Sequence, residues 1–194
     1  MYFSYYEKIG DTVICIDEEI LFDLPDNWCW TRLKSISDIV MGSSPQSTNV
    51  CTDETYMEFH QGKIFFSDYI IGNSHQYTKE ITKVSECGSV LLCVRAPVGE
   101  VNITDRDICI GRGLASIHPS SEMDVALLYH WLQSYKKELN NKATGSTFSA
   151  ITIDVVKNLL VPIPPKQEQL KILLAINESF ETLNTIEEIG RAHV

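Results

Sequence analysis

Three closely spaced prolines, followed by a long stretch without proline or glycine, constrain the fold of this chain more than any other feature. The prolines are Pro162, Pro164 and Pro165. Each proline fixes its own φ and biases the preceding residue toward extended geometry, so residues 161–165 are predicted to form an extended strand or connector. Residues 166–189 are uninterrupted and favour a single helix, about 36 Å long at about 1.5 Å per residue.

Apolar residues recur along this predicted helix at steps of three and four, which places them on one face. Such a face needs a partner, which is either the preceding domain or another long helix. The pattern spans only about two heptads, fewer than the three or four that a coiled-coil assignment requires, so both alternatives stay open. The predicted helix-pairing face consists of Leu173, Ile176, Phe180 and Leu183.

The length of 194 residues and the hydrophobic content of 44% suit one globular domain with a helical extension. We expect an α+β fold, in which a domain with a mixed sheet precedes the long C-terminal helix. The predicted division is a lead-in at 1–23, a domain at 24–164, the helix at 165–190 and a tail at 191–194. The chain has no basic-then-apolar N-terminal signal and no apolar run of about 18 residues, so a cytoplasmic location is expected.

The charge balance argues against nonspecific coating of nucleic acid. The formal net charge is −10, from 16 basic and 26 acidic residues, whereas phosphate neutralisation normally needs a basic excess. Many of the acidic residues cluster toward the two ends of the chain, and residues 31–171 are close to neutral. A neutral central domain remains compatible with specific contacts to nucleic acid.

The sequence contains none of the common catalytic or metal-binding motifs. Its six cysteines include no Cys-x-x-Cys pair, so reduced thiols are expected and no metal site is predicted. No Gly-x-Ser-x-Gly elbow, phosphate-binding loop or His-Glu-x-x-His pattern is present. We therefore predict a chain without catalytic activity.

The central part of the chain alternates apolar runs with polar turns. Residues 88–101 predict a buried strand, a proline-glycine turn and a return strand, and residues 108–117 predict a further strand pair. Residues 59–66 predict a strand with a glycine kink, and a capping box beginning at Ser121 predicts a helix that continues to Leu139. Trp28 and Trp30, two residues apart in an extended segment, are predicted to anchor the core.

Arg95 and Arg112 interrupt apolar runs. A guanidinium in such a run needs a carboxylate, a carbonyl or a phosphate as a partner, and structural pairing within the protein is the commoner outcome. The loops are rich in Ser, Asn and Gln, which usually means solvated connectors. In a nucleic-acid reader the same side chains donate and accept hydrogen bonds at base edges.

Several of these segments together resemble the specificity subunits of type I restriction-modification enzymes. The domain start Leu24-Pro25-x-x-Trp28-x-Trp30-x-x-Leu33 matches the usual opening of a target-recognition domain in that family. The prolines followed by Glu168-Gln169 are similar to the junction with the spacer helix. The internal segments Arg95-x-Pro97-x-Gly99 and Gly111-Arg112-Gly113 are the most specific matches.

The resemblance implies a target-recognition domain with one spacer helix, which amounts to half of a specificity subunit or a fragment of one. It implies sequence-specific recognition of double-stranded DNA without catalysis. The implied partners are modification (methyltransferase) subunits, which hold S-adenosylmethionine, and a restriction subunit, which uses ATP and Mg²⁺; no cofactor is implied for this chain. A homodimer through the C-terminal helix is a further expectation, and residues 1–23 resemble the end of a preceding spacer.

On this reading the polar loop residues and the two arginines face the DNA. The candidates are Ser44, Gln46, Gln61, Lys63, Asn73, His75, Gln76, Arg95, Arg112, Thr144 and Ser146. Two alternatives remain: the chain is the recognition portion of a single-chain restriction-methylation enzyme, or it is a helix-mediated interaction module that binds no DNA.

Overall fold

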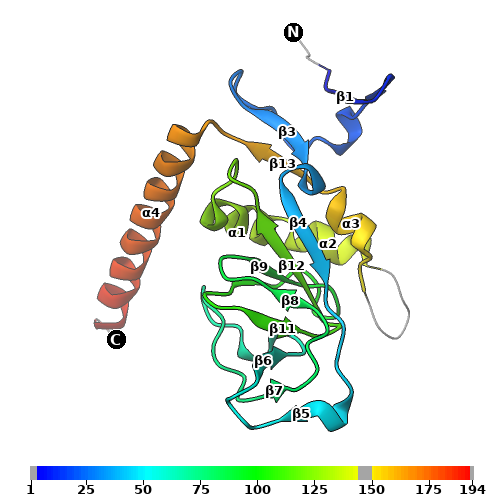
Figure 1. Cartoon of the computed structure of the whole chain (residues 1–194). Helices are drawn as coiled ribbons and strands as arrows, with labels where there is room; N and C mark the ends of the chain where they lie inside the picture. The colour runs from blue at the N-terminus through cyan, green and yellow to red at the C-terminus, as the bar shows by residue number, and fades with distance from the viewer. Residues whose placement is uncertain (1–3, 144–149, 193–194) are drawn as a thin grey trace.

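The computed structural model describes residues 4–143 and 150–192. It consists of a domain with two main sheets, three helices on the domain and one long helix beside it (Figure 1). One sheet has four strands in the order β10-β9-β12-β4: Val101–Ile103, Val90–Cys93, Leu114–Pro119 and Ser37–Met41. The other has five strands in the order β5-β7-β6-β11-β8: Val50–Cys51, Tyr77–Thr78, Met57–His60, Ile108–Ile110 and Val84–Ser85. The fold is α+β with mixed sheets, as predicted.

The four-stranded sheet lies between the helices and the five-stranded sheet, which explains its continuous apolar runs. Alternate residues of β9 point to opposite faces. Val90 and Leu92 join the core beneath the helices, whereas Leu91 and Cys93 join a second cluster with strand β11. Because β9 is buried on both faces, its sequence lacks the alternation of apolar and polar residues that marks a strand with one solvent-exposed face.

Helix α1 (Val125–Ser134) covers the four-stranded sheet, and α2 (Lys136–Lys142) follows it directly. Leu127, Leu128 and Leu132 of α1 are buried in the core. The helix begins after Asp124, whose side chain accepts a hydrogen bond from the Ala126 N–H, so the predicted capping box at Ser121 is wrong. Asp124 serves as the cap because its carboxylate is directly before the first helical turn.

The prediction of a strand pair over 108–117 is wrong in its pairing. Strands β11 and β12 both form, but they belong to different sheets. β11 pairs in parallel with β6 and antiparallel with β8, whereas β12 pairs with β4 and β9. The turn at Gly111–Gly113 therefore passes the chain from one sheet to the other.

The predicted strand over 59–66 is also shorter than expected. Strand β6 ends at His60, and residues Lys63–Phe65 form a 3₁₀ turn after Gly62. The predicted strand–turn–strand over 88–101 is confirmed by β9 and β10, which pair antiparallel.

The proline segment forms strand β13 (Leu160–Ile163), which pairs antiparallel with β3 (Cys29–Arg32). The five-residue helix α3 (Ile153–Lys157) precedes it. Helix α4 (Lys166–Ala192) begins directly after Pro165, whose carbonyl accepts the Glu168 and Gln169 N–H groups at 2.8 and 3.1 Å. The extended segment and the uninterrupted helix are both confirmed.

Trp28 and Trp30 lie near the connection between β13 and α4 rather than in the core, so the prediction that they anchor the core is wrong. Both are half-buried. Trp28 donates from Nε1 to Glu168 at 2.6 Å, and Trp30 packs against Phe22 with ring centroids 5.1 Å apart. They stabilise the region where β3 meets the start of α4.

The lead-in segment forms a hairpin of β1 (Tyr6–Ile9) and β2 (Thr12–Cys15). Arg32 of β3 holds this region by pairing with Glu7 at 2.7 Å and with Glu19 at 2.6 Å. Its assignment to the end of a preceding spacer, like the domain boundaries at 24 and 164, stays a prediction. Within 4–143 and 150–192, no helix is long and apolar enough to cross a membrane.

Candidate nucleic-acid interface

Three segments meet backbone against backbone where the chain passes between the two sheets. They are residues 42–44, 60–62 and 111–113, which we call the glycine junction. The Ser43 N–H donates to Ile110 O at 3.0 Å, the Gly111 N–H to His60 O at 2.8 Å, and the Gly113 N–H to Gln61 O at 3.2 Å. A Cβ at Gly42 would lie 2.1 Å from Gly111 O, so this approach requires glycine.

The glycine junction brings three of the predicted DNA-facing residues together. Ser44 Oγ donates to Gln61 Oε1 at 2.7 Å and accepts the Arg112 N–H at 3.2 Å. Gln61 and Arg112 are exposed. Among the residues that the structure describes, the Gln61 amide nitrogen and the Arg112 guanidinium have no hydrogen-bond partner, so both donors are available to a ligand.

Two more predicted residues lie next to the glycine junction along the backbone. The Val94 N–H donates to Gly113 O at 3.0 Å, which places Arg95 beside Gly113. Lys63, two residues after Gln61, pairs with Glu100 at 3.2 Å, and Lys136 pairs with the same carboxylate at 3.0 Å. Two ammonium groups share one carboxylate, so this group of three side chains carries a net positive charge.

The expectation that Arg95 and Arg112 pair within the protein is wrong. Both arginines are exposed at turns rather than buried in the apolar runs that flank them. No carboxylate among the described residues forms an ion pair with either. Exposed guanidinium groups need no internal partner, and they are free to contact phosphate or a base edge.

The predicted residues Asn73, His75 and Gln76 form a second exposed group, in the turn before β7. Asn73 Oδ1 accepts the His75 N–H at 2.6 Å, and His75 adopts a left-handed φ of 52°. Gln76 O accepts the Phe59 N–H of strand β6 at 2.8 Å. The backbone of this turn thus faces the sheet, and the three side chains are left exposed.

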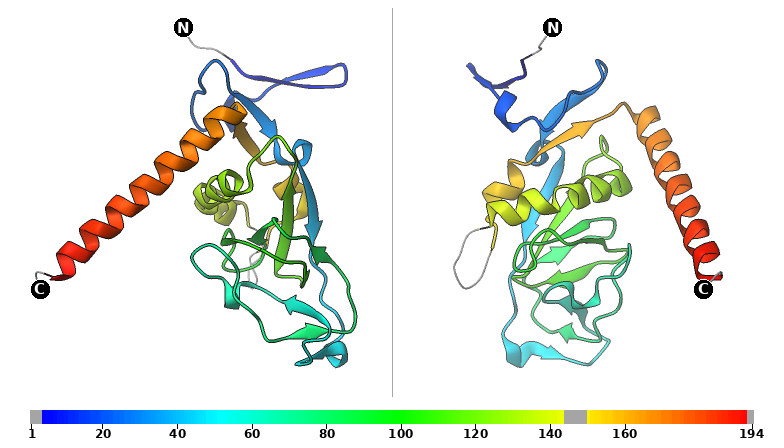
Figure 2. Two further views of the ribbon diagram at one scale, coloured as in Figure 1. Left: turned by 60° about the vertical axis from the view of Figure 1, so that its left-hand side comes forward. Right: turned by 180° about the vertical axis from the view of Figure 1, so that it is seen from behind.

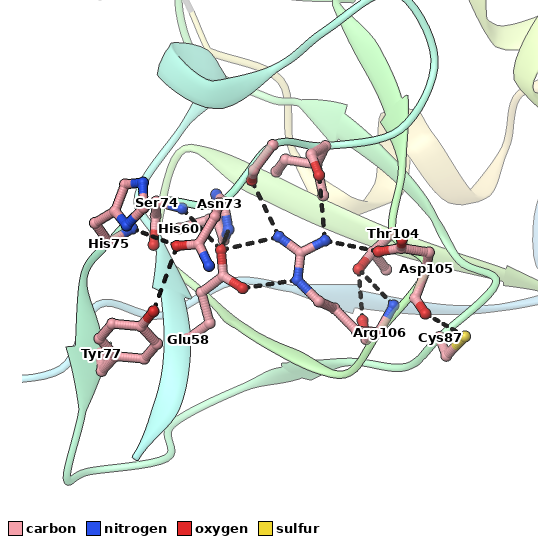
Figure 3. A network of polar contacts seen from close by, with 12 residues as sticks. Glu58, His60, Asn73, Ser74, His75, Tyr77, Cys87, Thr104, Asp105 and Arg106 are labelled. Carbon is pink, nitrogen blue, oxygen red and sulfur yellow. Dashed lines mark hydrogen bonds and ion pairs between the residues drawn. The ribbon is translucent and has the colours of Figure 1, made fainter. Parts of the chain in front are cut away.

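A charged network behind this turn was missed by sequence reasoning (Figure 3). Glu58 of β6 is 8% exposed and accepts hydrogen bonds from Arg106 Nε at 2.7 Å, the Ser74 N–H at 2.8 Å and His60 Nε2 at 2.7 Å. Burial raises the pKa of Glu58, but the hydrogen bonds from Arg106, Ser74 and His60 outweigh it and bring the pKa to about 2. The carboxylate is therefore ionised at neutral pH.

His60 is 1% exposed, and burial lowers its pKa, although its contact with Glu58 acts in the opposite direction. The neutral ring donates from Nε2 to Glu58, and its Nδ1 is buried without a hydrogen-bond partner. Two polar residues, Glu58 and His60, alternate with apolar residues in the strand Met57–His60, and Asp105-Arg106-Asp107 has the composition of an ordinary polar turn. Neither local pattern predicts that these side chains meet in one network.

The remaining predicted residues lie elsewhere. Gln46 is exposed, with its N–H donating to Glu80 at 3.0 Å, and it takes no part in either group. Thr144 and Ser146 lie outside the described residues. No group of His, Cys, Asp or Glu in the described part of the chain is arranged to hold a metal ion.

The predicted helix-pairing face of α4 is divided between the protein's own domain and solvent. Leu173 is partly buried against the domain core, so for this residue the alternative of packing on the preceding domain holds. Phe180 stacks on His130 of α1 with centroids 6.3 Å apart, yet it remains 53% exposed. Ile176, Phe180 and Leu183 line an open apolar groove along α4, whose later turns stand clear of the sheets (Figure 2).

The arrangement of this domain and its C-terminal helix recurs in solved structures and defines a structural class. The crystal structure of the HsdS subunit from Thermoanaerobacter tengcongensis aligns with a TM-score of 0.77 and 32% identity, over 87% of this chain and 41% of that chain. The type IIG restriction endonuclease BpuSI shares the fold alone, with a TM-score of 0.52 and 10% identity over 69% of this chain and 24% of that chain.

A sequence model described as the type I restriction modification DNA specificity domain matches residues 25–192, and the chain belongs to that family. A Methanocaldococcus jannaschii protein named as the type I restriction enzyme MjaX specificity subunit is 34% identical over 172 residues. The match covers 87% of this chain and 39% of that protein. The chain thus spans about two fifths of the length of the relatives that it matches.

Proposed function

We propose that this chain is a DNA-reading part of a type I specificity subunit, without catalytic activity, and that it recognises one segment of a double-stranded target. The observation that carries the proposal is the glycine junction, which displays Ser44, Gln61 and Arg112 on a rigid backbone within a family named for DNA specificity. Rigid support matters because base reading depends on the placement of donors and acceptors.

The chemistry of the glycine junction suits direct readout in the major groove. An arginine guanidinium donates two hydrogen bonds to guanine O6 and N7, and a glutamine amide pairs with adenine N6 and N7. Arg95 and Lys63 beside the junction are suited to phosphate contacts, which set register without reading sequence. Asn73, His75 and Gln76 supply a second group of polar side chains for the same duplex.

The partners proposed for this chain are those of a type I complex. The modification subunits hold S-adenosylmethionine, the restriction subunit uses ATP and Mg²⁺, and this chain holds none of these. Because residues 31–171 are close to neutral, most nonspecific DNA affinity should come from the partner subunits. The open apolar groove of α4 is proposed as the surface for another long helix, that of a second copy of this chain or of another subunit.

The test is to select duplexes from a randomised pool with the full chain assembled with its modification subunits. We expect one enriched motif, and we expect Gln61→Ala and Arg112→Ala each to lower affinity for that motif by roughly 5-fold to 150-fold and to relax one position of it. Lys171→Ala removes an exposed charge on α4 and serves as the control. The proposal fails if no motif is enriched, or if all three variants select the same motif with the same affinity.

A further inference from the structure

We propose that Glu58 and Arg106 are positioning residues for base reading, and that they set the conformation of the turn at 71–76. The inference rests on the proposed function and deepens it, since it names the groups that hold the reading residues Asn73, His75 and Gln76 in place. Neither Glu58 nor Arg106 is itself proposed to touch DNA.

Every N–H donor of the Arg106 guanidinium is used inside the protein (Figure 3). Nε and Nη2 donate to the two carboxylate oxygens of Glu58 at 2.7 and 3.0 Å. Nη2 also donates to Gly72 O at 3.1 Å, and Nη1 donates to Ile71 O at 3.2 Å and to Asp105 at 2.6 Å. A guanidinium has five such donors in a fixed fork, so this arginine fixes the geometry of all of its acceptors at once.

The turn is held from both sides of its backbone. Arg106 binds the carbonyls of Ile71 and Gly72, and Glu58 accepts the Ser74 N–H at 2.8 Å. Ser74 is 4% exposed, so its N–H has no access to water as an alternative acceptor. Directly after Ser74 the chain takes the left-handed conformation at His75, and the side chains of Asn73, His75 and Gln76 are exposed.

The same carboxylate reaches the glycine junction through His60. Glu58 accepts from His60 Nε2 at 2.7 Å, and His60 O accepts the Gly111 N–H at 2.8 Å. Gln61 follows directly. One ion pair therefore supports both exposed groups, the turn at 71–76 and the strand end that presents Gln61.

Stability alone is a weak reason for an ion pair in which Glu58 is buried and Arg106 is partly buried. Apolar residues of similar volume often replace such a pair without loss of stability, because desolvation of the charges offsets their attraction. An apolar pair has no groups that bind the Ser74 N–H or the carbonyls of Ile71 and Gly72. This difference separates a positioning role from a purely structural one, and it can be measured.

The experiment compares Arg106→Lys, Glu58→Gln and the double variant Glu58→Leu/Arg106→Met, each as the full chain assembled with its modification subunits. The first readout is hydrogen exchange of the Ser74 amide. The second is the ratio of affinities for the duplex selected from the randomised pool and for a scrambled duplex of the same composition. The double variant keeps the site filled without charge, so it remains informative if a single variant does not fold.

We expect faster exchange at Ser74 and a fall of about tenfold or more in the affinity ratio for Glu58→Gln and the double variant. Affinity for the scrambled duplex should change by less than about twofold, because phosphate contacts lie elsewhere. Arg106→Lys keeps the positive charge but loses the forked set of donors, so it should retain less than half of the wild-type affinity ratio.

A folded double variant that keeps the wild-type affinity ratio would overturn the positioning role. The triple variant Asn73→Ala/His75→Ala/Gln76→Ala separates this inference from the function on which it rests. If that variant leaves the ratio unchanged while Gln61→Ala lowers it, the turn does not read DNA, and the inference fails although the proposed function stands. If neither variant changes the ratio, the proposed function itself is wrong.

Discussion

At the scale of single residues, the buried pair of His60 and Glu58 makes stability sensitive to acid. Burial lowers the pKa of His60, so the unfolded chain takes up a proton at a higher pH than the folded chain does. The stabilisation is complete above the unfolded value of about 6.5 and is lost as pH falls below it. Glu58, with a folded pKa of about 2, adds a second loss as pH falls below about 4.5 toward that value.

The urea midpoint is therefore expected to fall between pH 7.5 and pH 5.5. His60→Gln replaces the Nε2 donor with an amide that does not titrate, so the fall should be smaller in this variant than in the wild type. Urea unfolding of both proteins at the two pH values measures the effect. His75→Gln, at an exposed position, is the control, and an equal fall in His60→Gln and wild type would contradict the assignment.

Leu128 is a residue whose role is packing alone. It is 0% exposed on the buried face of α1, so Leu128→Ala should lower the free energy of unfolding by about 2–5 kcal/mol. The matched change Leu170→Ala, at a leucine that is 61% exposed on α4, should cost about 0.5 kcal/mol or less. Urea unfolding of the two variants distinguishes core from surface, and similar losses would count against the core described for this domain.

At the scale of elements, two side chains of the first turn of α4, those of Glu168 and Gln169, bind it to the domain. Asn27 and Trp28 donate to the Glu168 carboxylate at 2.5 and 2.6 Å. Gln169, 1% exposed, accepts the Asp124 N–H and donates to Glu122 O and Pro164 O. The Glu-Gln pair after the prolines therefore fixes the direction in which α4 leaves the domain.

Gln169→Leu should weaken this attachment, because it leaves three buried or partly buried backbone groups without a partner. Each such group costs about 1–3 kcal/mol. Hydrogen exchange should become faster at the Asp124 amide, whose acceptor is lost. Gln167→Leu, at an exposed position on the same turn, is the control, and unchanged exchange at Asp124 in Gln169→Leu would show that the attachment depends on other contacts.

Local patterns predicted those elements whose cause is local. The prolines and the uninterrupted run fixed β13 and α4, and the Pro97–Gly99 turn indicated β9 and β10. The pairing of β11 with β6 could not be predicted from the sequence, because the two strands lie about fifty residues apart and their apolar side chains are compatible with many partner strands. Lys63–Phe65 forms a 3₁₀ turn although its residues favour a strand, because tertiary packing overrides the intrinsic β-strand propensity of a short segment.

The candidate site was predictable as a list of residues but not as an arrangement. Ser44, Gln61 and Arg112 were expected to face DNA, yet their mutual contact depends on backbone approach at Gly42 and Gly113. Arg106 was not expected at all, because burial of its partner Glu58 comes from the packing of two sheets, which no local spacing encodes.

At the scale of the whole molecule, charge limits what the chain does alone. A net charge of −10 opposes approach to DNA, so the isolated chain should bind a duplex no more tightly than about 10⁻⁴–10⁻⁶ M. Fluorescence anisotropy with short duplexes at about 150 mM salt measures this, and addition of modification subunits should tighten binding. Tight binding by the isolated chain without sequence preference would contradict the division of labour.

Self-association is expected through the open groove of α4. Phe180 and Leu183 are 53% and 56% exposed on this groove, so Phe180→Ser/Leu183→Ser should shift a dimer toward monomer in light scattering. Leu170→Ser/Leu174→Ser changes two equally exposed leucines outside the groove and should leave the oligomeric state unchanged. A wild-type chain that stays monomeric at high concentration would rule out the homodimer.

The pairing of β3 with β13 brings the two ends of the sheet domain side by side, next to the first turn of α4. A different domain grafted between these strands should keep α4 in its original direction, provided that it retains the carbonyl and the amide at Glu122 and Asp124 that hold Gln169. Under the proposed function, such a graft would change the DNA segment that is recognised and leave the surface of α4 unchanged.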